Sequence, residues 1–249
     1  MSEVQSLARG LQIIEKLAQS KESLSITELA DEYGVDKGSI SRMMQTLANY
    51  GFAEREQDGR KYILGPSVVR LSRMLLMRTP LRDTAKSYLK QLVELTGECS
   101  HLAILAQGQA LYIDQEESPS ALRVTTGIGT LAPLHCTALG KIFLGFAGVP
   151  INSELTPFTL RTITDLAILE RHLEIVRSQG YAVDDEEYNL GVRCIAVPIF
   201  DYRGKCVAAV GVSGPTSRLS LEQMQNVASI VVDIGKSLTA KLSFSAIGK

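Results

Sequence analysis

The sequence lacks several features that would have assigned it to a class at once. No run of about 18 apolar residues occurs, so no membrane-spanning helix is predicted. Lys and Arg number 26 against 27 Asp and Glu, so no excess of one sign marks the whole chain for nucleic acid or membrane. The first six residues, MSEVQS, lack the basic and apolar regions of a secretion signal. We therefore expect a cytoplasmic protein that binds no membrane.

Cysteine spacing excludes two further classes. The four cysteines stand apart without a CxxC pair, which argues against a zinc finger or a disulfide framework and favours reduced thiols. With 45% hydrophobic and 21% charged residues the composition is that of a globular protein. A length of 249 residues is typical of one or two domains, and we take two as the working expectation.

The first 50 residues predict three helices. The first, over residues 6–19, has apolar residues at three- and four-residue steps that indicate one buried face: Leu7, Leu11, Ile14, Leu17 and Ala18. Ser25 and Glu28 fit a capping box that starts a second helix, which ends near Gly34. Asp36 caps a third helix over residues 37–50, whose inward residues are Ile40, Met43, Met44 and Leu47. Two short helices joined by a tight turn predict a helix-turn-helix.

A β-hairpin is predicted directly after these helices. Residues 52–56 and 60–64 flank Gln57-Asp58-Gly59, and Asp-Gly is a strong signal for a hairpin turn. Helices followed by such a wing predict a winged helix-turn-helix.

The remaining chain has a mixed α/β pattern. A helix over 67–79 breaks at Pro80, and a second helix follows over 81–96. Beyond it we predict strands at 101–106, 110–115, 122–126, 181–184, 195–200 and 207–213, and helices near 137–146, 165–179 and 220–244. We therefore expect a winged helix-turn-helix over 1–65, a linker helix over 66–80 and an effector-binding and oligomerisation domain over 81–249. The predicted fold class is α+β.

The outward face of the third helix has the chemistry of a DNA reader. Gly38, Arg42, Gln45 and Asn49 lie opposite its apolar face. Arginine pairs with guanine and glutamine with adenine in the major groove, so Arg42 and Gln45 are the predicted base readers. The predicted contacts at the groove edge and phosphates are Lys37, Ser39 and Ser41 of the helix and Arg60 and Lys61 of the wing.

The alternative interpretation is a solvated face on a protein-interaction module. Residues 1–65 hold eight Lys and Arg against ten Asp and Glu, a net charge of −2, whereas DNA-binding modules are commonly basic. Residues 66–90 hold six Lys and Arg against one Asp, a net charge of +5 beside the predicted reader. Because one winged helix-turn-helix makes few contacts with DNA, we expect two chains to pair by two-fold symmetry on a palindromic operator. Leu71, Met74, Leu75 and Arg78 are candidates for the pairing contacts, although they could equally pack on their own domain.

Several motifs resemble the IclR family of bacterial transcriptional regulators. They cover nearly the whole chain: VQSLARGLQIIEKLA, LSITELADEYGVDKGSISRMMQTLANYGFAER, YILGP, TGECSHLAIL, PLHCTALGKIFL, RTIT, GYAVDDEEYNLGVRCIAVPIFD and VGVSGPTSRLS. The block that begins at Asp184 is the most specific of them. The resemblance implies a winged helix-turn-helix, a linker helix, a C-terminal effector domain with a GAF-like α/β fold, and dimers or dimers of dimers on operator DNA. By family habit it implies repression rather than activation.

An anion site is expected at the start of the helix after Thr137. Thr137 is the predicted cap, and the free amides and positive dipole end of a helix start attract a carboxylate. The resemblance to members that bind small 2-oxo acids implies an effector site made of Ala138, Leu139, Asp184 and Cys194, with walls at Val124, Ala132 and Val192. Leu139 departs from the smaller residues typical of members that respond to glyoxylate and pyruvate. The identity of the small organic acid is therefore not carried over.

Other residues leave alternatives open. We expect Glu186 and Glu187 to form a solvated acidic turn. Arg193 could have a structural role by neutralising that turn, and His172 is expected to be an exposed helix residue. A metal-sensing site could bring together His101, His135, Cys136 and Cys194. Cys136, near a helix start, could be a redox sensor. Cys136 or Cys194 could also be a hydrolytic nucleophile, with His135 as its base and Asp184 as the group that orients the base. We predict no cofactor and no enzymatic activity.

Overall fold

The structure is a computed structural model that describes residues 4–56, 59–77 and 80–247. The chain divides into two compact units, Met1–Thr79 and Pro80–Lys249. The predicted strands and helices largely lie within two residues of the observed ones, and each unit is described by itself below.

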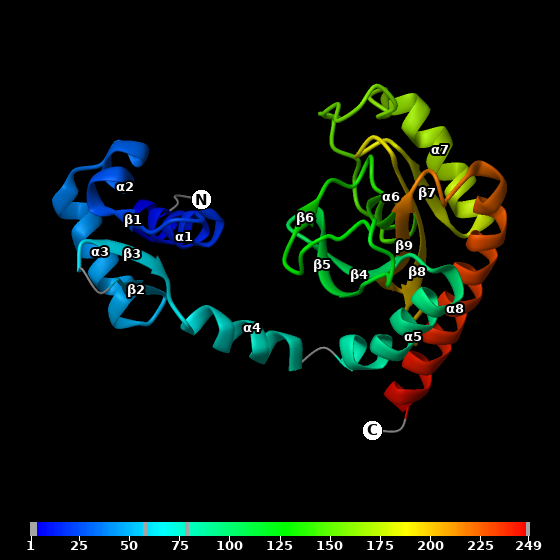
Figure 1. Ribbon diagram of the computed structural model, residues 1–249, viewed down its shortest axis with the longest axis horizontal. Coiled ribbons are helices and arrows are strands. Elements are labelled where there is room, and N and C mark those ends of the chain that lie inside the picture. The colour runs from blue at the N-terminus through cyan, green and yellow to red at the C-terminus, as the bar shows by residue number, and fades with distance from the viewer. Residues whose placement is uncertain (1–3, 57–58, 78–79, 248–249) are drawn as a thin grey trace. The chain divides into compact units, whose positions relative to one another are not determined.

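The N-terminal unit is a winged helix (Figure 1). Its elements are α1 Gln5–Gln19, β1 Leu24–Ser25, α2 Ile26–Tyr33, α3 Lys37–Asn49, β2 Ala53–Arg55, β3 Lys61–Leu64 and α4 Ser67–Met77. The three strands form an antiparallel sheet in the order β1-β3-β2. The short strand β1 is an addition to the sequence prediction. Gln57 and Asp58 of the predicted hairpin turn lie outside the described residues, whereas Gly59 has a φ of +71°.

The predicted caps set the ends of the two central helices. Ser25 accepts a hydrogen bond from the Glu28 amide and the Glu28 carboxylate accepts one from the Ser25 amide, so the capping box is confirmed. Gly34 ends α2 in the left-handed conformation at a φ of +61°. Asp36 then caps α3 by accepting from the Ser39 amide. These three local signals fix the turn between the helices.

The predicted inner face of α1 is wrong in part. Ile13 and Leu17 are the residues that enter the core, where they pack with Leu29 and Ile40. The side chains expected there and found exposed are Leu7, Leu11 and Ala18. The reason is that the small core receives one side of α1, so the second apolar side stays uncovered. Leu7 and Leu11 instead line an apolar groove together with Leu47, Tyr50 and Leu71.

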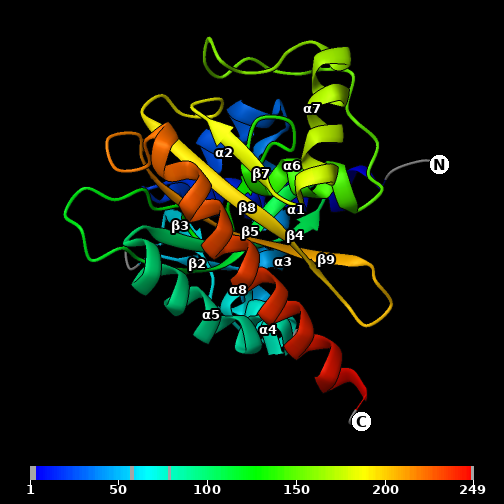
Figure 2. The ribbon, with the colours of Figure 1, turned by 90° about the vertical axis from the view of Figure 1, so that its right-hand side faces the viewer.

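The C-terminal unit is a six-stranded antiparallel sheet in the order β6-β5-β4-β9-β8-β7. Its elements are α5 Pro80–Thr96, β4 Cys99–Ala106, β5 Gln109–Glu116, β6 Leu131–Ala132, α6 Ala138–Phe146, α7 Leu166–Gln179, β7 Ala182–Asp185, β8 Val192–Phe200, β9 Cys206–Pro215 and α8 Leu221–Ile247. Helices α5 and α8 run side by side across one face (Figure 2). Helix α6 packs on the other face, with α7 outside it. The predicted α+β class is confirmed.

The strand expected at Leu122–Thr126 is wrong, because this segment is a loop. The Leu122 carbonyl accepts a hydrogen bond from Arg218 at 2.9 Å, so a side chain occupies an acceptor that a neighbouring strand would use. The loop rejoins the sheet edge where the Tyr112 amide donates to the Thr130 carbonyl. Val124 and Thr126 thereby come to lie on the wall of the cavity described below.

Among the described residues, no helix is both long and apolar enough to cross a lipid bilayer.

Candidate functional site

Helix α3 presents a polar, exposed face built on a buried one. Ile40 and Met44 are fully buried, and Met43 and Leu47 pack on the same core. Lys37, Gly38, Arg42, Gln45 and Asn49 are exposed on the opposite side. The inward residues predicted for this helix are confirmed, and the outward residues are available to a partner.

Hydrogen bonds along α3 hold the two predicted base readers against the helix. Arg42 donates from Nη2 to Ser39 Oγ at 3.1 Å, and Gln45 donates from Nε2 to Asn49 Oδ1 at 2.8 Å. Both side chains therefore lie along the surface of α3. In the wing, Arg60 is exposed and Lys61 is half-buried in β3, and Ser39 and Ser41 are half-buried on α3.

A cavity of about 320 Å³ lies between α6, the sheet and the 124–130 loop. It is lined by all of the residues expected at the effector site: Val124, Ala132, Ala138, Leu139, Asp184, Val192 and Cys194. The structure therefore brings these residues together from the loop, β6, α6, β7 and β8, although 70 positions separate the first from the last. What they bind remains a prediction.

The N-terminus of α6 supplies hydrogen-bond donors at one wall of the cavity. Thr137 caps this helix by accepting from the Gly140 amide at 3.1 Å, so the predicted cap is confirmed. The first amides of an α-helix have no intrahelical acceptor and lie at its positive dipole end. Ala138 and Leu139, which carry those amides, line the cavity. This wall suits a carboxylate.

The cavity also contains polar residues that the sequence interpretation omitted from the effector site. His101, Tyr112, Thr126 and Ser213 line it, and Ser213 donates to Cys194 Sγ at 3.1 Å. Burial lowers the pKa of His101 to about 4 and raises the pKa of Tyr112 well above its usual range. A histidine within the apolar run HLAIL was the one signal in the sequence that could have indicated this wall.

Asp184 is the acidic group of the cavity wall. Its side chain is buried, and Oδ1 accepts a hydrogen bond from the Glu187 amide at 2.8 Å. Burial raises the pKa of Asp184 to about 7, against a lowering contribution from Lys141. Near neutral pH this carboxyl is therefore divided between a protonated form, which donates a hydrogen bond, and an anion, which only accepts.

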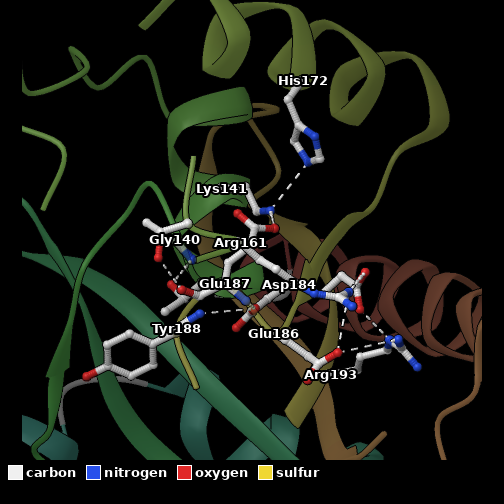
Figure 3. A network of polar contacts seen from close by, with 12 residues as sticks. Gly140, Lys141, Arg161, His172, Asp184, Glu186, Glu187, Tyr188 and Arg193 are labelled. Atoms are coloured by element: carbon white, nitrogen blue, oxygen red, sulfur yellow. Dashed lines mark hydrogen bonds and ion pairs between the residues drawn. The ribbon is translucent and has the colours of Figure 1, made fainter. Parts of the chain in front are cut away.

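Behind Asp184 lies a buried ion pair that the sequence interpretation did not contain (Figure 3). Lys141 of α6 is fully buried, and its Nζ lies 2.5 Å from Glu187 Oε1 and 3.3 Å from His172 Nε2. The solvated turn expected for Glu187 is thus wrong, because Lys141 draws this carboxylate into the interior. The exposed position expected for His172 is also wrong, because α7 packs on α6 and half-buries the ring. Burial lowers the pKa of His172 to about 4.

Arg193 binds the acidic segment after Asp184 and links it to the Leu219 backbone. Its Nε donates to Asp185 at 2.5 Å and its Nη1 donates to the Leu219 carbonyl at 2.8 Å, so the structural role expected for Arg193 is confirmed. Glu186 is half-buried, accepts from the Gly191 amide at 2.8 Å and lies 3.3 Å from Arg161. The solvated position expected for Glu186 is therefore wrong as well. These contacts hold the β7–β8 connection against the cavity.

The described cysteines are unsuited to thiolate chemistry. All four are free, and burial raises the pKa of Cys136 to about 12 and that of Cys194 well above its usual range. Burial therefore argues against a reactive, low-pKa thiol at Cys136. Within the part of the chain that the structure describes, no three His, Cys, Asp or Glu side chains are grouped as metal ligands. His135 instead contacts the Thr156 carbonyl at 3.0 Å.

The raised pKa of Asp184 predicts a pH-dependent effect of Asp184→Asn on stability. Between the ordinary pKa of 3.8 and the folded value of about 7, the folded chain binds more protons than the unfolded chain. Stability contributed by this group therefore falls as pH rises from about 4 to about 7. Asparagine keeps the acceptor for the Glu187 amide without the buried charge, so the variant should gain stability over the parent at pH 8 and much less at pH 5.

Urea denaturation of the full chain at the two pH values measures this difference. Asp233→Asn, an exposed position on α8, is the matched control and should show the same small effect at both. Equal effects of Asp184→Asn at pH 5 and pH 8 would contradict the buried titration.

Comparisons with known proteins agree with this architecture. The family model "IclR helix-turn-helix domain" matches residues 6–57, and "Bacterial transcriptional regulator IclR C-terminal" matches residues 74–240. The chain is 33% identical to the HTH-type transcriptional regulator BhcR of Paracoccus denitrificans, over 95% of this chain and 86% of that protein. It is 30% identical to the transcriptional repressor IclR of Escherichia coli, over 95% of this chain and 89% of that protein.

A solved structure shares the fold. It is an IclR homolog from Microbacterium hydrocarbonoxydans complexed with 4-hydroxybenzoate, with a TM-score of 0.79 and 21% identity, covering 95% of this chain and 98% of that one.

Proposed function

This chain belongs to the IclR family of bacterial transcriptional regulators, and from that premise we propose that it is a repressor whose operator affinity is altered by a small organic acid. The observation that carries the proposal is the cavity of the C-terminal unit, around which the seven expected effector residues converge. Its relatives are transcriptional regulators rather than enzymes.

The DNA-binding part of the proposal is supported by α3. Arg42 and Gln45 are exposed and of the types that pair with guanine and adenine edges in the major groove. Lys37, Ser39 and Ser41 then contact the phosphates at the groove edge, and Arg60 and Lys61 of the wing contact the backbone of the operator. Double-stranded DNA is accordingly the proposed partner of the N-terminal unit.

Pairing of two chains is supported by apolar residues left exposed in the N-terminal unit. Five apolar side chains are each more than 40% exposed: Leu7 and Leu11 on α1, Tyr50 directly after α3, and Leu71 and Met74 on α4. Burying these side chains against a second copy would remove apolar area from water. A homodimer, or a dimer of dimers, would present two α3 helices to an operator with two-fold symmetry. Arg78, also expected in this contact, lies outside the described residues.

The class of effector is supported by the size and polarity of the cavity. Its volume of about 320 Å³ lies at the small end of ligand pockets. The α6 amides suit a carboxylate, and one solved structure of this fold is a complex with the carboxylic acid 4-hydroxybenzoate. A small acid bound there changes the fraction of dimers in which the distance between the two N-terminal units matches the spacing of the operator half-sites.

The test measures binding of the full chain to DNA upstream of its own gene by fluorescence anisotropy, against a scrambled duplex of the same length. We expect at least a thousandfold preference at moderate salt, since specific sites are typically bound about 10³–10⁷ times more tightly than random DNA. A panel of small carboxylates is then added, and one of them should change the operator affinity severalfold. Equal binding to both duplexes, with and without the acids, would overturn the proposal.

A further inference from the structure

One buried polar side chain on the cavity wall is left without a partner. His101 lies on β4, is 1% exposed, and neither of its ring nitrogens has a hydrogen-bond partner among the described residues. Its ring meets Tyr112 edge to face at 5.5 Å, which fixes the ring by an apolar contact rather than by a polar one. A buried polar group left unpaired destabilises the folded chain, so its presence requires an explanation.

The other two histidines show what a satisfied ring looks like in this fold. His135 contacts the Thr156 carbonyl at 3.0 Å, and His172 contacts Lys141 Nζ at 3.3 Å. Neither of them lines the effector cavity, whereas His101 does. The unpaired ring thus belongs to the one histidine that lines the cavity.

The sheet register places His101 on the same surface as the acidic end of the cavity. His101 of β4 is paired with Gly211 of β9. Ser213 lies two residues further along β9 and is paired with Cys194 of β8. Cys194 is in turn paired with Asp184 of β7. Directly opposed residues of antiparallel strands, and every second residue along one strand, share a face. Position 211 carries no side chain, so none from this position of β9 stands between the imidazole and the cavity.

We propose that His101 is a specificity-determining residue that hydrogen-bonds a hydroxyl group of the effector, which makes the ligand a small hydroxycarboxylic acid. A neutral imidazole offers one donor and one acceptor, and a hydroxyl can pair with either nitrogen whichever tautomer is present. The carboxylate of the same ligand lies at the α6 amides. The low pKa of His101 keeps the ring neutral near pH 7, so it recognises a dipole rather than a second negative charge. This inference rests on the proposed function.

The experiment uses three pairs of acids that differ by one hydroxyl: glycolate and acetate, lactate and propanoate, 4-hydroxybenzoate and benzoate. Calorimetric titration of the full chain should show that one hydroxylated acid binds about 10-fold to 100-fold more tightly than its partner. His101→Phe should abolish that ratio and leave the affinity for the partner acid within a few fold. His101→Asn, which keeps a donor and an acceptor, should retain part of it, and His135→Gln is the matched control with the full ratio.

Nitrogen-15 spectra of histidine-labelled parent chain give a second measurement that needs no cavity variant to fold. With three histidines in the sequence, the His101 signals are assigned by comparison with the His135 variant and a His172→Gln variant. The hydroxylated acid should move the His101 ring signals and the partner acid should leave them nearly unchanged. A bound acid that shows no hydroxyl preference, or a preference that survives His101→Phe, overturns the role of His101 alone. If none of the six acids binds, both this inference and the proposed effector class fail.

Discussion

Replacing Arg42 by alanine is expected to abolish operator recognition while leaving weak binding to random DNA. The Arg42 guanidinium is exposed on α3 and donates to Ser39 at 3.1 Å. Its loss removes a group that can donate two parallel hydrogen bonds to a base, and it leaves the buried side chains Ile40 and Met44 unchanged. One bidentate contact to a base contributes about 1–3 kcal/mol of discrimination, and a two-fold dimer makes it twice. The expected loss is therefore about 30-fold to about 25,000-fold in operator affinity, measured by anisotropy and by footprinting.

Two comparisons separate base reading from simple loss of charge. Lys37→Ala, at the exposed start of the same helix, should weaken specific and random binding alike and reduce the dependence of binding on salt. Arg171→Ala makes the same truncation at an exposed position of α7 and should change neither. If Arg42→Ala gives the footprint of the parent chain, α3 does not read the operator through this residue.

The parts of the fold that the sequence predicted correctly are those encoded by neighbouring residues. Ser25 with Glu28, and Asp36 with the amide three residues on, act within one helical turn, so their side-chain chemistry is sufficient to place the helix starts. Thr137 does the same for α6. The seven cavity residues were also predicted, because motifs shared with the family identify the corresponding positions in this chain without any derivation of their contacts.

The errors concern contacts between residues far apart in the chain. In the sequence Glu187 is one acidic residue in a run of four. Its burial follows from its ion pair with Lys141 of α6, which is 46 residues away in the chain. His172 is buried by the packing of α7 on α6 and not by its own helix pattern. The periodicity of α1 correctly predicted a helix but not which side of it the small core covers. Such choices depend on three-dimensional packing, which a hydrophobic pattern does not specify.

Replacing Lys141 by methionine is expected to give the largest loss of stability of any single change considered for the C-terminal unit. The substitution leaves the Glu187 carboxylate, 6% exposed, without its cation, and removing one partner of a buried ion pair costs about 3–5 kcal/mol. Burial already raises the pKa of Glu187, and Lys141 is the group that opposes this shift. Without it Glu187 can take up a proton, so the cost of the variant should be smaller at pH 5 than at pH 8. Hydrogen exchange of α6 peptides in the full chain, followed through a urea series, measures the loss.

The double variant Lys141→Met, Glu187→Gln decides whether the loss comes from the unpaired charge. With both charges removed the free energy of unfolding should return to within about 1–2 kcal/mol of the parent, because replacing a whole buried pair is often nearly neutral. Lys90→Met breaks the exposed pair with Glu94 on α5 and should cost less than about 1 kcal/mol. A double variant no more stable than Lys141→Met would mean that the lysine acts through its packing against α7. Recovery would mean that charge compensation by Lys141 is what holds the segment after Asp184 in place beside the effector cavity.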